Sequence, residues 1–138
     1  MRLGMGIRRT ANVLGRAAFY DAARLVELGS LIALVAWVRV LVTDPTLLAR
    51  DVYSSFQVLS TDSWVALFAA AATFQAAGIV SISLAALRIL GLGAASGLWA
   101  VVTLTFASQP TPTTATGVYL AMSVVTFLGT LYVAARED

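Results

Sequence analysis

Four long apolar runs dominate the chain, and short polar segments separate them. The first, at residues 25–42, covers 18 residues, which is roughly 27 Å of helix and just enough to cross a bilayer. None of the runs alternates like a barrel strand, and lipid offers the backbone no hydrogen-bond partner, so each run must be helical. The pattern predicts an all-α integral membrane four-helix bundle forming a single membrane domain over residues 1–138, with spans at about 25–43, 64–83, 88–107 and 117–135.

A basic arm at residues 1–24 precedes the first span. Its apolar residues recur at spacings of three and four, and polar residues follow another stripe, which predicts an amphipathic helix. On the membrane surface, each arginine near anionic head groups contributes roughly 1 kcal/mol of binding. Docking of the arm on a partner chain is the alternative interpretation. The residues expected to contact the membrane surface or a partner are Arg8, Arg9, Arg16 and Arg24.

The arginines also predict the orientation of the chain, because cationic segments resist translocation. With four spans, the arm, the turn that contains Arg88 and the segment that contains Arg136 fall on one side and together carry seven arginines. The opposite side holds one, Arg50, in an outer loop at residues 44–63, together with an uncharged segment rich in Pro and Thr. We therefore expect both termini to lie in the cytoplasm.

The outer loop at residues 44–63 has a helical pattern of its own. Asp44 and Pro45 supply a cap and a first-turn proline. Four apolar residues then share one helical stripe: Leu48, Val52, Phe56 and Leu59. The pattern predicts a short interfacial helix, with an irregular loop and a re-entrant segment as the alternatives.

Few polar side chains lie inside the spans. Glu27 is about one turn from the inner end of the first span and Arg39 about one turn from its outer end, so both can reach the membrane surface. An interhelical polar contact is the alternative for Arg39. Gln75, near the middle of the second span, is expected to hydrogen-bond between helices rather than to line a conduction path.

Small residues mark faces on which helices can approach closely. In the third span, Gly93 and Gly97 form a GxxxG pair. Similar faces on the first and second spans comprise Gly29 with Ala33, and Ala69 with Thr73 and Ala76. We expect all seven residues to serve helix packing, either within one chain or between chains.

Aromatic residues gather near the ends of the spans. Trp37, Tyr53, Trp64 and Tyr119 lie near the predicted outer ends, which is typical of an interfacial aromatic belt. Trp99 lies deeper, and we expect it to be a packing residue.

Composition narrows the chemistry that the chain can perform. Of its 138 residues 59% are hydrophobic and 12% are charged, more apolar surface than a soluble domain of this size can bury. There is no Cys and no His, and all nine basic residues are Arg. Thiol nucleophiles, zinc sites, imidazole acid–base pairs and Schiff-base lysines are therefore excluded. We expect no enzyme activity, cofactor, metal or small-molecule substrate, and no nucleic-acid partner, since the arm has few aromatics and no recognised motif.

The order of these features resembles a known group of proteins. A basic arm and a span lead into DPTLLARDVYSSFQVL, then into TDSWVALFAAAATFQAAGI and two closely following spans. Over most of residues 25–135 this layout is similar to the small four-span membrane proteins of tailed bacteriophages, some of which are holin-like. The chain departs from typical holins at its end, Arg136–Glu137–Asp138, which is not strongly basic.

The resemblance implies a protein of the bacterial inner membrane that self-associates, either to open the host membrane or to help pass virion components across it. The alternative is an accessory structural subunit of a larger membrane complex, such as an energy-transducing assembly. In both cases the expected partners are the lipid bilayer and either copies of the chain or neighbouring membrane proteins.

Overall fold

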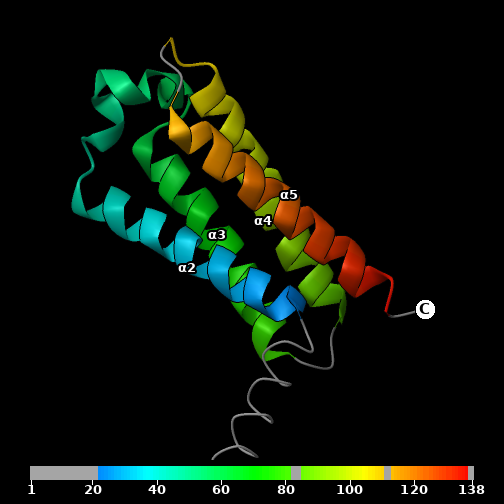
Figure 1. Ribbon diagram of the computed structural model, residues 1–138. Helices are drawn as coiled ribbons and strands as arrows, with labels where there is room; N and C mark the ends of the chain where they lie inside the picture. The colour runs from blue at the N-terminus through cyan, green and yellow to red at the C-terminus, as the bar shows by residue number, and fades with distance from the viewer. Residues whose placement is uncertain (1–21, 82–84, 111–112, 137–138) are drawn as a thin grey trace, which may run out of the picture.

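Four long α-helices form a bundle (Figure 1). The computed structural model describes residues 22–81, 85–110 and 113–136, and within these ranges every regular element is helical. The long helices are α2 (Ala22–Thr43), α3 (Thr61–Val80), α4 (Ala85–Ala107) and α5 (Thr114–Ala134). Each is long and apolar enough to cross a membrane, so the chain is an all-α integral membrane protein, as its sequence predicts.

The helices alternate in direction, which gives the bundle two distinct ends (Figure 1). At the loop end, residues 44–60 join α2 to α3, and α4 is followed by α5. At the terminal end, α2 begins and α5 ends. Each helix packs on the next in sequence, and α5 also packs on α2. Of the four, α4 buries the largest share of its residues inside the bundle.

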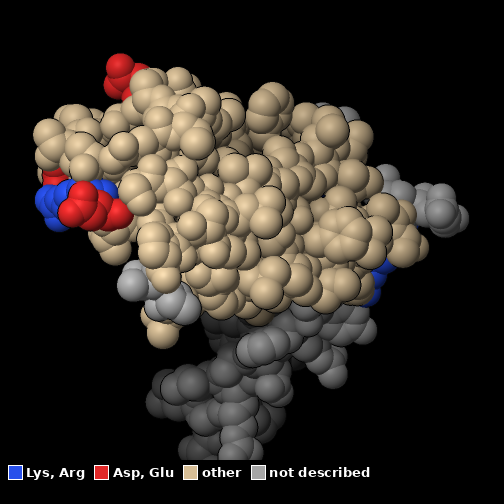
Figure 2. Space-filling view, turned by 90° about the horizontal axis from the view of Figure 1, so that it is seen from above, with Lys and Arg blue, Asp and Glu red and all other residues tan. Residues whose placement is uncertain are grey.

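The outer surface of the bundle suits lipid. Figure 2 shows one face of the molecule, on which the charged side chains lie at the margins. Large apolar side chains are exposed on all four helices, among them Ile32, Val80, Leu104 and Phe127. A surface of this kind is stable in a bilayer but not in water.

The helices begin earlier than hydropathy predicts. Spans expected from residues 64, 88 and 117 start at Thr61, Ala85 and Thr114. At α3 the reason is visible, because the Ser60 hydroxyl accepts a hydrogen bond from the Ser63 backbone N–H at 3.2 Å and caps the helix. At α3 and α5 the added first turns are polar, so these turns belong to the helices although only the apolar turns that follow are predicted as membrane spans.

The loop between α2 and α3 is helical, but as two short 3-10 helices, η1 (Leu47–Ala49) and η2 (Asp51–Val58), where the sequence predicts one short interfacial helix. The cap residue of η1 is Thr46 rather than Asp44, but Asp44 organises the turn before it: its carboxylate accepts from the Thr46 hydroxyl at 2.7 Å and pairs with Arg50 at 2.6 Å. The Thr46 hydrogen bond, aided by the Arg50 charge, lowers the pKa of Asp44. Of the predicted apolar stripe, Leu48 and Phe56 are buried, whereas Val52 and Leu59 are exposed.

Two glycines let α3 and α4 approach closely. A Cβ added to Gly78 would lie 3.0 Å from the Arg88 Cα, and one added to Gly91 would lie 3.0 Å from the Gln75 Cα. These are backbone atoms of the facing helix, which cannot move aside as a flexible side chain can. The close contact therefore depends on glycine at both positions.

Replacing Gly91 by alanine is expected to lower the free energy of unfolding by about 1–2 kcal/mol, because separating the helices outweighs the better helix propensity of alanine. Gly29→Ala is the matched control, since a Cβ added at Gly29 would meet no atom within 4 Å and only the propensity gain applies. Unfolding of both variants in mixed micelles measures the difference. Equal stability of the two variants would contradict the close α3–α4 contact.

Most of the small residues predicted to serve helix packing do not form close helix contacts within the chain. Gly29 and Gly97 are exposed, with nothing within 4 Å of an added Cβ, and Gly93 meets only a Thr130 methyl at 4.0 Å. Thr73 is also exposed, and its hydroxyl donates to the Ala69 carbonyl of its own helix. Ala33 packs against the core, and Ala69 and Ala76 are half-buried. The buried small residues of α3 are instead Ala71, Ala72 and Gly78.

Candidate functional site

A carboxylate and a guanidinium meet inside the bundle near its terminal end. Arg88 Nε donates to Glu27 Oε1 at 2.9 Å and so links α4 to α2. The Glu27 side chain is 2% exposed and that of Arg88 is 14% exposed, so both charges are largely shielded from the medium around the bundle. Ion pairs are far stronger at low dielectric, and an ion left there without its partner is costly. We refer to Glu27 and Arg88 as the buried charge pair.

Gln75 lies in the same part of the interior. Gln75 and Glu27 are each five residues from the terminal end of their helices, a depth of about 7–8 Å. Gln75 is 1% exposed, and neither atom of its amide nor Glu27 Oε2 has a hydrogen-bond partner among the described residues. The interhelical bond that the sequence predicts for Gln75 is therefore not formed there.

Other polar groups do form interhelical bonds. The Ser96 hydroxyl donates to the Ser123 carbonyl at 3.0 Å, and the Ser123 hydroxyl donates to the Ser96 carbonyl at 3.1 Å, which ties α4 to α5. Trp99 Nε1 donates to the Ser30 hydroxyl at 2.9 Å and ties α4 to α2. These bonds are helix–helix contacts of the kind expected in membranes. The three serines were not identified from the sequence, and Trp99 was expected only to pack.

An aromatic network fills the half of the bundle toward the loop end. Eight rings from the helices and η2 contact one another in a continuous set: Trp37, Tyr53, Phe56, Trp64, Phe68, Trp99, Phe106 and Tyr119. Phe56 and Phe68 are fully buried and Trp64 is 1% exposed. The aromatic belt predicted for the membrane interface is thus mostly turned inward, and Trp99 is a packing residue as expected.

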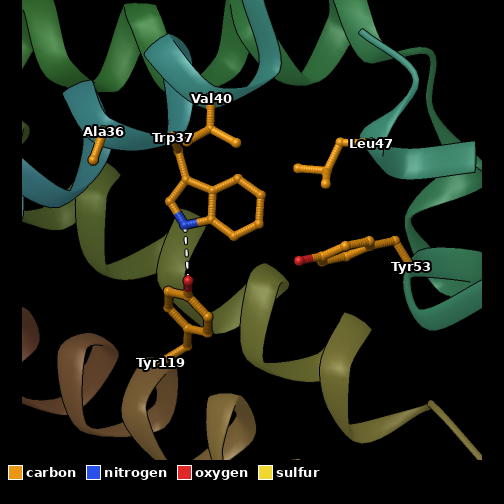
Figure 3. Close-up of a pocket in the computed structure, with 6 residues that line it drawn as sticks. All are labelled: Ala36, Trp37, Val40, Leu47, Tyr53 and Tyr119. Carbon is orange, nitrogen blue, oxygen red and sulfur yellow. Dashed lines mark hydrogen bonds between the residues drawn. The ribbon is translucent and has the colours of Figure 1, made fainter. Parts of the chain in front are cut away.

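The tryptophans of this network keep their polar atoms satisfied. Trp64 Nε1 donates to the Phe56 carbonyl at 2.8 Å, which fastens η2 to α3. Trp37 Nε1 donates to the Tyr119 hydroxyl at 3.0 Å, across α2 and α5 (Figure 3). Satisfied indole groups explain how such rings can be buried without a penalty.

Beside this network, a slot of about 240 Å³ opens between α2, the loop and α5. Figure 3 shows the residues that line it, with the Tyr53 hydroxyl directed toward the Trp37 ring. Its wall combines aromatic and aliphatic side chains: Ala36, Trp37, Val40, Leu47, Tyr53 and Tyr119. We call this feature the aromatic slot.

A second hollow, of about 370 Å³, lies on the outside of α3 and α4. Its lining is almost entirely apolar and includes the small residues Ala70, Ala94 and Gly97. We call it the Gly97 groove. It is the place where one glycine of the predicted GxxxG pair opens to the membrane.

The remaining predicted site residues are arginines. Arg39 is exposed on α2 and has no hydrogen bond or ion pair with any part of the chain that the structure describes. The interhelical contact is therefore not formed there, and its reach to the membrane surface stays a prediction. Arg24 lies in α2, is half-buried and is engaged in an interaction. Arg8, Arg9 and Arg16 lie outside the described residues.

The described residues provide tightly packed helices, one buried charge pair and an apolar outer surface that suits contact with lipid. Within residues 22–81, 85–110 and 113–136, no three Asp, Glu, His or Cys side chains gather in a way that could hold a metal ion. Comparison of the chain with known protein families, with characterised proteins and with solved structures finds no match.

Proposed function

We propose that this chain is a non-enzymatic membrane protein that self-associates in the bilayer through the Gly97 groove. The observation that carries the proposal is the open glycine of α4, which has nothing within 4 Å of an added Cβ and lines an apolar hollow. In lipid there is little hydrophobic drive between helices, so association depends on close backbone approach at small residues. A helix of a second copy fits this requirement.

The interior of the bundle supports the same proposal. The aromatic network occupies its loop-end half, with Phe56, Phe68 and Trp99 fully buried. A packed interior of this kind leaves little room for an aqueous route through one chain. Any passage across the membrane would therefore run between copies arranged around a shared axis.

The test is a pair of valine substitutions at open glycines. Gly97→Val is expected to weaken self-association about tenfold, because the added side chain holds a partner helix away from α4. Gly29→Val is the matched control, since it adds the same side chain to an equally open position on α2. Energy transfer between copies labelled at a cysteine introduced by Ala135→Cys, in vesicles at varied protein-to-lipid ratios, measures association.

Association of Gly97→Val at the unmodified level, or an equal loss in Gly29→Val, would exclude the Gly97 groove as the interface. Circular dichroism of both variants checks that the helices are intact.

For the biological setting, we propose the phage-type role that the four-span layout implies: a holin-like opening of the membrane, or passage of virion components. The membrane would be the bacterial inner membrane, with the terminal end facing the cytoplasm because seven arginines lie in the arm or near the helix ends on that side. The packed interior also favours a second candidate, an accessory structural subunit that fills space in a larger complex.

A further inference from the structure

The aromatic slot lies close to the loop end of the membrane-spanning helices. Trp37 is six residues from the end of α2 and Tyr119 five residues from the start of α5, so both are within about 9 Å of the loop end of their helices. Tyr53 reaches the same space from η2. The slot is therefore near the membrane surface on the loop side.

Two phenol groups in this slot have hydrogen-bond capacity to spare. The Tyr119 hydroxyl accepts from Trp37 Nε1, but among the described residues nothing accepts its proton. The Tyr53 hydroxyl has no hydrogen-bond partner at all within the same ranges, although its ring packs on Phe56 and Phe106. A ligand of the slot should therefore supply acceptor oxygens.

An exposed cation, Arg39, lies next to the slot along α2 but is not one of its lining residues. Arg39 is three residues beyond Ala36, which sets it about 60° around α2 and about 4.5 Å closer to the loop end. Its side chain is exposed and unpaired within the described part of the chain, whereas the other arginine near this end, Arg50, is paired with Asp44. An anionic group beside the slot would meet a free guanidinium.

We propose that the aromatic slot binds the glycerophosphate region of a membrane phospholipid. The phosphate lies near Arg39, an ester carbonyl accepts from Tyr53, and an acyl chain continues along the apolar outer surface. At about 240 Å³ the slot is smaller than pockets that enclose a whole ligand, roughly 300–1,000 Å³, which suits one section of a longer molecule. Trp and Tyr are also enriched at the membrane–water interface.

The test uses the full chain in detergent micelles and native mass spectrometry with three probes: dioleoyl phosphatidylglycerol, dioleoylglycerol and inorganic phosphate. We expect phosphatidylglycerol to bind about tenfold more tightly than dioleoylglycerol, and inorganic phosphate not to bind. Tyr53→Phe should weaken both lipids about fivefold, since it removes one hydrogen bond and keeps the ring. Arg39→Gln should weaken phosphatidylglycerol about tenfold and leave dioleoylglycerol unchanged.

Tyr132→Phe and Arg136→Gln are the matched controls, because they change the same groups at the terminal end. The proposal is overturned if either test variant binds phosphatidylglycerol as its control does, or if inorganic phosphate competes with the lipid. Arg39→Gln alters only an exposed side chain, so it decides the question even if Tyr53→Phe fails to fold. Neither result depends on self-association, which the Gly97 variants test separately.

Discussion

The Phe56→Ala variant is expected to lose about 3–5 kcal/mol of unfolding free energy. Phe56 is fully buried, and its ring contacts those of Trp37, Tyr53, Trp64 and Phe106 at centroid distances of 5.0–5.9 Å. Truncation opens a cavity where the loop meets the helices, and rings held by their neighbours cannot all collapse into it. Unfolding of the variant in mixed micelles measures the loss.

Phe127→Ala is the control for this prediction. Phe127 is 52% exposed on α5, so its ring faces lipid and its removal leaves no internal cavity. We expect a loss below about 1 kcal/mol. Similar losses in the two variants would mean that the loop does not pack on the bundle as described.

Removing one member of the buried charge pair is expected to have an effect of similar size. Glu27→Leu should lower the unfolding free energy by about 3–5 kcal/mol, because the largely buried Arg88 guanidinium loses its ion pair with the Glu27 carboxylate. The double variant Glu27→Leu/Arg88→Leu should recover at least half of that loss, since it removes both buried charges of the pair together. Unfolding of the wild type, both single variants and the double variant completes a double-mutant cycle.

The same double-mutant cycle can also contradict an interaction between Glu27 and Arg88. If the losses in the two single variants simply add in the double variant, Glu27 and Arg88 do not interact. Asp51→Leu provides a background value, because Asp51 is an exposed carboxylate in η2.

The number of spanning helices follows from the sequence because lipid imposes one simple condition on the backbone. Each membrane-spanning segment must satisfy its own hydrogen bonds, so a long apolar run is a helix whatever its neighbours are. The first residues of the helices are predicted less accurately from the sequence. Ser60 caps α3, and polar first turns extend α3 and α5 beyond their apolar runs, a signal that hydropathy does not contain.

The faces of the helices could not be predicted in the same way. In spans that are apolar all around, the buried stripe is not marked by periodicity, so Gly93 and Gly97 looked like the closest contact when Gly78 and Gly91 provide it. The inward aromatic rings were missed for a related reason. Trp and Tyr near a span end suit either the interface or the core, and only the folded loop, which brings Phe56 over the helices, decides between them.

The buried charge pair could in part have been predicted from the sequence. Glu27 is near the start of the first span and Arg88 near the start of the third, so an alternating topology already puts them at one end of the bundle. Opposite charges at one depth suggest a pair. Whether the two side chains meet depends on which faces of α2 and α4 point inward. Only the structure shows these faces.

Self-association is the central claim, and the mass of the unmodified chain's complex after gentle extraction from its membrane tests it most directly. The account predicts a species whose mass is a multiple of the 14.5 kDa chain, with more than one copy present. A complex that contains a single copy among other membrane proteins would contradict it and favour the accessory-subunit role. A lone monomer at all protein-to-lipid ratios would contradict both.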